Sequence, residues 1–310
     1  MNFTKPKFWD HSGSSFWSIV LYPFSVLFLF VSLAIRLLKK QKKYHIPIIC
    51  VGNIYLGGTG KTPLVREIYE LLKNCNKQPA IVKKNYNYLK DEINFLNKFT
   101  KLYTSKDRVA GINRLIEDNN KVAILDDGLQ DKSINIDFKI LCFNAKQWIG
   151  NGQVIPSGPL REPVKSVIDY DCIIINGKKD VIKEKVLTKY NPLLNIFYSS
   201  YELVEKDFFV GKKIVAFAGI GNPKNFFDLI LENNLNLIKS FSYPDHYEFK
   251  EKEMDEMLEF SENNNSILIT TEKDYFRLNN IYCNKVKAAK VKLNIENHKE
   301  FEKLLLNKIK

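Results

Sequence analysis

A glycine-rich segment at residues 57–62 combines the residue types that bind phosphate groups. Its residues are Gly57, Gly58, Thr59, Gly60, Lys61 and Thr62. Glycines allow backbone N–H groups to curl around phosphate oxygens, and a helix that begins directly after them adds partial positive charge. In such a P-loop, Lys61 would contact the β- and γ-phosphates of a nucleotide, and Thr62 would bind Mg²⁺. The strict pattern has a glycine at the position of Tyr55, but the context, after a buried strand and before a helix, favours phosphate binding.

An acidic pair follows the apolar run at residues 122–125. Asp126 and Asp127 come directly after this run. In nucleotide sites Mg²⁺ is held by one or two carboxylates together with phosphate oxygens. If the strand continued through both residues, their side chains would point to opposite sides, and one carboxylate would lie nearer the metal. Together with residues 57–62, the pair predicts a site for ATP and Mg²⁺.

Two other polar segments are weaker candidates. Residues 271–274 read Thr-Glu-Lys-Asp, which resembles a guanine-reading loop but has its lysine one position too late. We interpret this segment as a helix start, with Thr271 as the cap and carboxylates in the first turn. His246 follows Asp245 in a loop. A loop histidine is more often a surface residue, although one that holds a carboxylate could assist deprotonation of a hydroxyl.

The elements that must position these residues alternate between strands and helices. Short apolar runs suited to buried strands occur at residues 46–51, 80–82, 122–125, 139–143 and 172–175, with a helix expected at residues 63–73. A second strand–turn–helix unit begins at residues 214–218; its helix is expected from about residue 224, followed by a helix near 251–263 and strands at 267–269 and near 286–291. Residues 191–210 are interpreted as the connection between domains. This order predicts a mostly parallel sheet flanked by helices.

Composition narrows the class of protein further. The chain has 310 residues, 45% of them hydrophobic, which is enough for two domains with buried cores. The formal net charge of +12 suits an anionic lipid, nucleic acid or an anionic substrate, with nucleic acid the least favoured. The five cysteines show no C-x-x-C spacing, so we expect small buried side chains in a reducing compartment.

The N-terminal segment is long and apolar. Residues 16–35 contain no charged residue, and such a helix would span about 30 Å, the hydrocarbon thickness of a bilayer. A basic cluster follows, at Arg36, Lys39, Lys40, Lys42 and Lys43, and is expected on the cytoplasmic side. Polar residues also share one helical stripe that includes Ser18, Tyr22, Ser25 and Ser32, so the helix could lie in the membrane interface instead of crossing it. A cleaved signal peptide and a buried core helix are less favoured alternatives.

Taken together, the motifs of this chain resemble the tetraacyldisaccharide 4′-kinase family, the kinases of lipid A biosynthesis. The resemblance extends from about residue 46 to residue 278 and rests on the order and number of the matching segments. These segments are residues 51–53 with 57–63, 106–110 (Lys-Asp-Arg-Val-Ala), 125–130 (Leu-Asp-Asp-Gly-Leu-Gln), 156–163 (Pro-Ser-Gly-Pro-Leu-Arg-Glu-Pro), 216–223, 244–246 and 270–274. The N-terminal apolar helix also resembles the membrane helix of that family.

The resemblance implies an organisation and a reaction. Residues 1–44 would form a membrane-associated helix and basic flank, residues 45–200 a P-loop NTPase-like kinase core, and residues 201–310 a smaller α/β domain that closes the active-site cleft. The γ-phosphate of ATP would move to the 4′-hydroxyl of tetraacyldisaccharide 1-phosphate and form lipid IVA, on the cytoplasmic face of the inner membrane. The expected partners are this acylated lipid, ATP with Mg²⁺ and inner-membrane lipid, with no nucleic acid.

The resemblance also assigns roles by position. Nucleotide contacts would come from the P-loop residues already named, together with Arg108 and Arg161. The metal site would contain Thr62, Asp126, Asp127, Gln130 and Glu162. Asp91 corresponds to the family's catalytic carboxylate and would act as the base, and His246 would pair with it across the domain cleft.

The chain departs from the family pattern on the substrate side. Residues 83–88 read Lys-Lys-Asn-Tyr-Asn-Tyr where the family usually has Ser-Arg-Gly-Tyr-Gly-Arg, and the stretch from there to Asp91 is short. Asp131 replaces the usual histidine after Gln130. The assignment of Asp91 therefore depends on order and neighbouring residues.

Two hypotheses from other functional classes remain. A membrane-associated P-loop ATPase of the partitioning type would switch partners without phosphorylating a lipid, but its loop carries a lysine where this chain has Leu56. A non-enzymatic basic protein that binds nucleic acid at the membrane would leave both the P-loop and the Asp126-Asp127 pair unexplained.

Overall fold

The computed structural model describes residues 5–10, 13, 15–85 and 90–309, except for the side chains of Arg36 and of residues 90–92. The chain forms two compact units. The large unit contains residues up to Lys84, Thr100–Ser200 and the segment from Ile295, and the small unit contains Asn85–Phe99 and Tyr201–Asn294. The sequence resemblance implies a single division at residue 200. In the structure, residues 85–99 belong to the small unit and the segment from residue 295 belongs to the large unit.

The large unit is built on an eight-stranded sheet with the order β12-β7-β6-β5-β1-β4-β2-β3. The strand pairs that connect β3 through β7 are all parallel, as the alternation of elements predicts. The bounds of these strands are β1 Ile48–Gly52, β2 Pro79–Lys84, β3 Leu102–Ser105, β4 Val122–Asp126, β5 Phe138–Asn144, β6 Cys172–Asn176, β7 Asn195–Leu203 and β12 Val291–Ile295.

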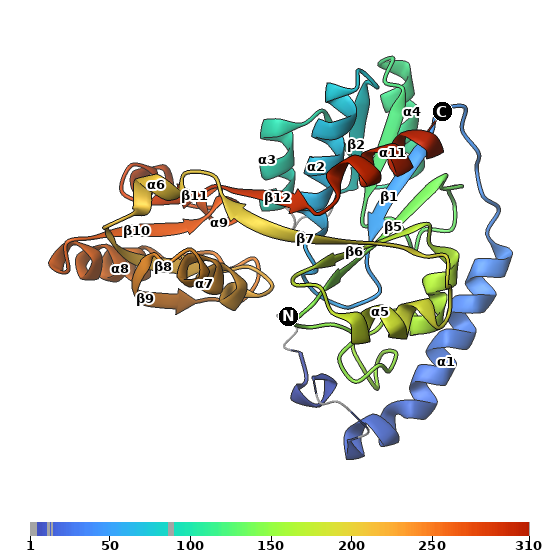
Figure 1. The fold of residues 1–310 in the computed structure, drawn as a ribbon, viewed down its shortest axis with the longest axis horizontal. Helices are drawn as coiled ribbons and strands as arrows, with labels where there is room; N and C mark the ends of the chain where they lie inside the picture. Colours follow the sequence, from blue (N-terminus) through green and yellow to red (C-terminus); the bar gives the residue numbers. More distant parts are fainter. Residues whose placement is uncertain (1–4, 11–12, 14, 86–89, 310) are drawn as a thin grey trace. The chain divides into compact units, whose positions relative to one another are not determined.

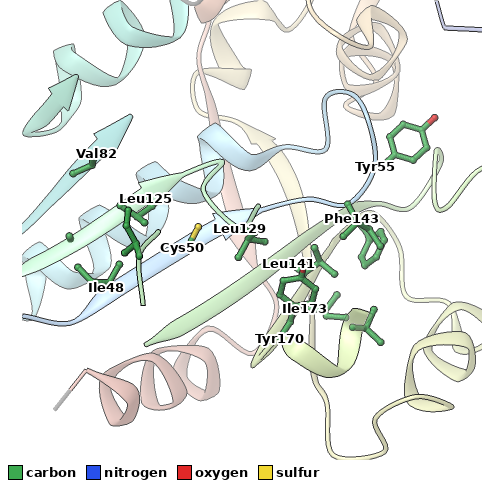
Figure 2. Close-up of a cluster of buried hydrophobic side chains, with 14 of the residues drawn as sticks. Ile48, Cys50, Tyr55, Val82, Leu125, Leu129, Leu141, Phe143, Tyr170 and Ile173 are labelled. Carbon is green, nitrogen blue, oxygen red and sulfur yellow. The ribbon is translucent and has the colours of Figure 1, made fainter. Parts of the chain in front are cut away.

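Helices cover the sheet of the large unit (Figure 1). They are α2 Lys61–Asn74, α4 Arg108–Glu117, α5 Val181–Thr188 and α11 His298–Lys308, with a short 3₁₀ helix, η3, at Val164–Asp169. Alternate strand residues form one buried layer, in which Ile48 and Cys50 of β1 lie near Val82 and Leu125 of the neighbouring strands (Figure 2). Leu115 of α4 closes this layer, while α2 contacts β1, β2 and β4. The sheet therefore brings the carboxyl ends of β1, β2 and β4 together at the start of α2.

The N-terminal helix α1 (Phe16–Leu38) is attached to the large unit along a narrow stripe. Ser25 Oγ lies 2.8 Å from both the Val154 carbonyl oxygen and Ser157 Oγ, and it accepts a hydrogen bond from Ser157 N. Phe28 and Leu29 pack against the core, whereas most other large apolar side chains of the helix are exposed. Its segment Phe16–Ile35 is long and apolar enough to cross a membrane, with a mean hydropathy of 2.3, and only 11% of it is buried.

This burial corrects one interpretation of α1 and divides the polar stripe of another. A helix that is almost entirely exposed is not a core helix of the described structure. The polar stripe is also divided, because Ser18 and Ser25 are buried against the large unit while Tyr22 and Ser32 are exposed. The outward surface of α1 is therefore mostly apolar, with Tyr22 and Ser32 as exposed members of the polar stripe.

The small unit contains a second parallel sheet, with the order β11-β10-β8-β9. Its strands are β8 Lys213–Ala218, β9 Asn236–Ser242, β10 Ser266–Thr271 and β11 Lys287–Ala289. Its helices are α3 Lys90–Phe99, α6 Lys206–Phe209, α7 Pro223–Glu232, α8 Glu251–Asn263, α9 Glu272–Tyr275 and α10 Asn280–Cys283. The helix α3, from the first third of the sequence, contacts α9, and its Phe95 ring packs on the ring of Phe276, which directly follows α9.

Several boundaries differ from those expected. The presumed connection at residues 191–210 contains β7 and α6, and the run at residues 286–291 contains β11 and the start of β12 instead of one strand. The strands β3 and β9 were not anticipated. The expectation of buried cysteines is confirmed for Cys50, Cys142 and Cys172, whereas Cys75 and Cys283 are half-buried. Burial raises the pKa of the Cys50 and Cys142 thiols to about 12.

Candidate active site

The phosphate-binding segment lies between β1 and α2, as the sequence predicts. Helix α2 begins at Lys61, and Gly60 caps it in a left-handed conformation with φ of 89°. Gly57 also has a positive φ, of 143°, which glycine adopts without the steric cost that a Cβ would bring. Asn53 supports the loop, since its side-chain amide donates to the carbonyls of Tyr55 and Gly57. Asn53 is fully buried and, beyond its place in the family pattern, was not assigned a role.

Lys61 and Thr62 face the acidic pair at the end of β4. Lys61 Nζ lies 3.8 Å from Asp127 Oδ1, and the lysine side chain is 14% exposed. The Thr62 hydroxyl lies 3.5 Å from Asp126 Oδ2. Both contacts join the first turn of α2 to the carboxyl end of β4, so the structure brings together the two strongest sequence signals.

The two aspartates differ in backbone conformation. Strand β4 ends at Asp126, and Asp127 has a left-handed conformation with φ of 57°, so the strand does not continue through both residues. Asp127 consequently turns toward Lys61 and Arg161, whose Nη1 lies 3.4 Å from each carboxylate oxygen of Asp127. The condition for opposite directions, a strand that continues through both residues, is therefore not met.

The charge environment favours the ionised form of Asp127. Its burial opposes ionisation, but the positive charges of Lys61, Arg161, Lys83 and Arg108 together outweigh that effect and lower the pKa of its carboxyl group. Asp127 is therefore an anion at neutral pH.

Arg108 is engaged in holding the segment after β4. Its Nη2 donates to the Asp127 carbonyl at 2.7 Å, and its Nη1 donates to Asp131 Oδ2 at 3.1 Å. Asp131, which replaces a histidine of the family pattern, also accepts a bond from the Ser133 hydroxyl. Burial raises the pKa of Asp131, but the hydrogen bonds from Ser133 and the charge of Arg108 outweigh this and lower it. In this structure Arg108 positions residues 127–131, and its expected phosphate contact stays a prediction.

A second hydrogen-bonded group connects Arg161 to Glu162. Arg161 Nη1 donates to Gln130 Oε1, and Gln130 Nε2 donates to Glu162 Oε1 and to the Asn53 carbonyl. The Tyr170 hydroxyl donates to Glu162 Oε2, and burial together with this carboxylate raises the pKa of Tyr170. Each oxygen of Glu162 thus accepts a hydrogen bond that helps to orient the carboxylate, and its expected metal contact stays a prediction.

A buried lysine is the feature that the sequence interpretation missed. Lys83 of β2 forms an ion pair with Asp126, and the side chains are 5% and 1% exposed. In the sequence this lysine was visible only as a departure from the family's usual segment. The pair depends on how β2 and β4 align, which no local pattern indicates.

The donor set fits Mg²⁺, although the described residues contain no group of three His, Cys, Asp or Glu side chains that could hold a metal ion. Asp126 Oδ1 and Thr59 Oγ1 are buried without a hydrogen-bond partner in the part of the chain that is described. Mg²⁺ usually binds through one or two protein oxygens, with phosphates and water completing an octahedron. Asp126 and Thr62 offer oxygens of this kind beside the P-loop.

The predicted base and its partner both belong to the small unit. Asp91 lies in α3, but its side chain is outside the described residues, so its pairing with His246 stays a prediction. His246 has φ of 59°, and its Nε2 lies 3.8 Å from Asp245 Oδ1. Because residues 85–99 group with residues 201–294, such a pairing would lie within one unit instead of across a cleft between two.

The segment at residues 271–274 has a structural role, as its interpretation as a helix start requires. Thr271 caps α9 by accepting a bond from the Asp274 backbone N–H. The fully buried Asp274 accepts a bond from Gly219 N and forms an ion pair with Arg277. Arg277 in turn donates to the Gly219 carbonyl. These bonds fix the turn after β8.

Comparison with known proteins identifies the family. A model of the family described as "Tetraacyldisaccharide-1-P 4'-kinase" (LpxK) matches residues 17–93 and 90–310. The chain belongs to this family. The tetraacyldisaccharide 4′-kinase of Pelagibacter ubique (strain HTCC1062) is 40% identical over 313 residues, covering 100% of this chain and 98% of that protein. The enzyme of the same name from Rickettsia canadensis (strain McKiel) is 31% identical, covering 96% and 97%.

A solved structure supports the fold. The crystal structure of the "apo" form of LpxK from Aquifex aeolicus in complex with ATP has a TM-score of 0.71 and 24% sequence identity, covering 94% of this chain and 99% of that chain. The family resemblance and the fold class are therefore confirmed. The chain is an enzyme of a lipid A 4′-kinase family with a P-loop fold, and the hypothesis of a partitioning ATPase is not favoured.

Proposed function

We propose that this chain transfers the γ-phosphate of ATP to the 4′-hydroxyl of tetraacyldisaccharide 1-phosphate, with lipid IVA as the product. The observation that carries the proposal is the P-loop at the start of α2, where Lys61 lies close to Asp127 and Thr62 lies close to Asp126. The model of the kinase family also matches almost the whole length of the chain. The relatives' names supply the acceptor.

In this proposal the large unit binds and orients the nucleotide. The P-loop N–H groups and Lys61 hold the phosphates, and Arg161, tied to Asp127 and Gln130, would approach them from the other side. Thr62 and Asp126 would bind Mg²⁺, and Asp127, Gln130 and Glu162 would orient its surroundings. Mg²⁺, when bound, neutralises the charge that develops on the transferring phosphoryl group. Phosphoryl transfer needs such positioning and charge neutralisation more than covalent chemistry.

The small unit would supply the proton acceptor. Asp91 would accept the proton of the 4′-hydroxyl as the bond to phosphorus forms, and His246 would orient Asp91. The support for these roles is the position of Asp91 in the family pattern and the presence of α3 and His246 in the same unit.

The helix α1 would attach the enzyme to the cytoplasmic face of the inner membrane, lying in the interface. A spanning helix needs a hydrocarbon environment along its length, but Ser25, near the middle of α1, is buried against residues 154–157 of the large unit. The exposed apolar side chains and the basic cluster after the helix suit an anionic lipid surface. An enzyme whose substrate is acylated gains access to it from this position.

A phosphoryl-transfer assay tests the reaction. The protein is incubated with γ-labelled ATP, Mg²⁺ and tetraacyldisaccharide 1-phosphate in mixed micelles, and the lipids are separated. A Mg²⁺-dependent, bis-phosphorylated lipid is the expected product. Labelled phosphate released without labelled lipid, from protein that binds ATP, would contradict the proposed acceptor and support an ATPase.

Depth-dependent quenching tests the orientation of α1. Trp17 is 59% exposed near the start of the helix, and Leu37, near its other end, can be replaced by tryptophan in a variant that lacks the native Trp17. Both positions, and a tryptophan placed in the middle of the helix, should be quenched by lipids brominated close to the headgroup, because an interfacial helix holds its whole length at the same depth. Quenching near the bilayer centre at a mid-helix tryptophan, with both ends shallow, would show that the helix spans.

A further inference from the structure

The buried ion pair between Lys83 and Asp126 is set by the sheet. Strands β2 and β4 are adjacent and parallel, and Lys83 lies directly opposite Asp126 in their register. Opposed residues of a parallel pair place their side chains on the same face of the sheet. Lys83 therefore approaches Asp126 on the face that α2 covers, where the first turn of α2 also presents Thr62.

Burial makes this pair a strong local constraint. The side chains of Lys83 and Asp126 are only 5% and 1% exposed. A buried charge without a partner is costly, so each of these side chains requires the opposite charge of the other. The ammonium group and Thr62 both lie on the Oδ2 side of Asp126, while Oδ1 has no hydrogen-bond partner among the described residues.

We propose that Lys83 is a positioning residue of the nucleotide site, which holds the Asp126 carboxylate in place and competes with divalent metal for it. This inference rests on the proposed function only in that Asp126 serves the metal. A cation that approaches Asp126 must share the carboxylate with the ammonium group that already neutralises it. Metal binding in the absence of nucleotide is thereby weakened, and the phosphates of ATP supply the further negative charge that recruits the metal.

A purely structural role makes a different prediction. If the pair only joined β2 to β4, replacing Lys83 would lower stability but would leave the metal affinity of the folded protein unchanged. The affinity for Mn²⁺, an octahedral oxygen-binding substitute for Mg²⁺, therefore distinguishes the two roles. It is measured on the full-length protein without nucleotide, by electron paramagnetic resonance of free Mn²⁺.

The central variant is Lys83→Met, which keeps the length of the apolar stem and removes the charge. We expect it to bind Mn²⁺ about tenfold more tightly than the wild type, because one competing positive charge is removed beside the carboxylate. Lys84→Met is the matched control: Lys84 is the next residue of β2, its side chain points to the other face, and its affinity should equal that of the wild type. Lys83→Gln should change affinity in the same direction, and circular dichroism verifies the fold of each variant.

A double variant locates the effect. In an Asp126→Asn background, the Lys83→Met change should no longer affect Mn²⁺ affinity, because the contested carboxylate is absent. Equal Mn²⁺ affinity of the wild type and of the folded Lys83 variants, including no measurable binding to any of them, would overturn the proposal. So would a gain that persists with Asp126→Asn, since it would reflect net charge alone.

The measurement is independent of the kinase assay. It uses neither ATP nor lipid, so failure to phosphorylate tetraacyldisaccharide 1-phosphate would refute the proposed acceptor without changing the Mn²⁺ result. Conversely, lipid phosphorylation with identical Mn²⁺ affinities would leave the kinase function in place and remove the role of Lys83.

Discussion

The nucleotide region of the large unit and the region around His246 in the small unit are held in place by different means. Around the P-loop, Asp126 and Lys83 are almost fully buried and bonded through adjacent strands. His246 instead lies in a loop with a positive φ, its side chain is 24% exposed, and its Nε2 lies 3.8 Å from Oδ1 of its own neighbour, Asp245. Sheet register therefore pre-organises the first region, whereas the second relies on a loop and on α3. Substitutions should separate the two.

The largest effect is expected at Lys61. Lys61→Ala should lower turnover by at least about a thousandfold, because the lysine neutralises charge on the transferring phosphate. Lys73→Ala, at the exposed end of the same helix, is the control and should be close to the wild type. Turnover of labelled ATP into lipid is measured, with circular dichroism to verify folding. Retained turnover in Lys61→Ala would remove the P-loop from the mechanism.

Asp91→Ala should separate binding from transfer. We expect turnover to fall by about a hundredfold to ten-thousandfold, the usual contribution of a general base, while ATP affinity stays unchanged. Glu92→Ala is the neighbouring control and should retain most activity. Calorimetric ATP binding and single-turnover transfer are compared for both variants. Unchanged turnover in Asp91→Ala would move the base to another residue, with Glu92 and Asp107 as the first to test.

Asp274→Ala should destabilise the small unit alone. The change deprives Arg277 of a buried carboxylate and Gly219 N of its acceptor, and breaking such a pair costs about 3–5 kcal/mol. Hydrogen exchange should accelerate in β8 and β10 and stay at wild-type rates in β1 and β4. Glu232→Ala, an exposed change in α7, is the control. Equal acceleration in both sheets would mean that the two units unfold as one.

His246→Ala should have a smaller effect than Asp91→Ala, since we propose that His246 acts through that residue. Turnover should fall about tenfold, with little change in the KM for ATP, because a misplaced base loses rate without loss of nucleotide contacts. His298→Ala, in the large unit and 42% exposed, is the control. An undiminished rate would show that His246 is only a surface residue.

The smallest effect is a pH dependence that Asp127 should produce in the nucleotide region. The pKa of Asp127 in the folded protein lies below the ordinary value. The charged carboxylate therefore stabilises the fold at pH values above the unfolded-state pKa, and this contribution is lost as the pH falls through the folded-state pKa. Chemical unfolding from neutral pH down to about pH 3 should show a weaker acid dependence for Asp127→Asn than for the wild type. Identical slopes would contradict the charge environment described for Asp127.

Local patterns predicted the nucleotide region well. The roles of the glycines before Lys61 and of the acids after residue 125 can be predicted from nearby residues in the sequence. Both segments lie where those patterns indicate. The buried strands were found because continuous apolar runs are typical of parallel sheets covered on both faces. The strand β9 was missed because most of its residues are exposed, and β3 because it is short and only half-buried.

Long-range register could not be predicted in the same way. The ion pair of Lys83 with Asp126 depends on the alignment of two strands that are far apart in the sequence. The bonds of Arg108 to residues 127–131 depend on the position of α4 relative to β4. For the same reason no local pattern indicated that α3 groups with residues from the second half of the chain.

The return of the chain to the large unit has a consequence for synthesis. Phe301 and Leu305 of α11 are fully buried, and the Phe301 ring packs on Phe197 of β7. A ribosome that has made β1, β4 and the P-loop has therefore not yet made the residues that are buried against β7 of the same sheet. Part of the apolar surface of the nascent large unit therefore stays exposed until the small unit and then α11 have been translated. Chaperones have a long interval in which to bind this surface.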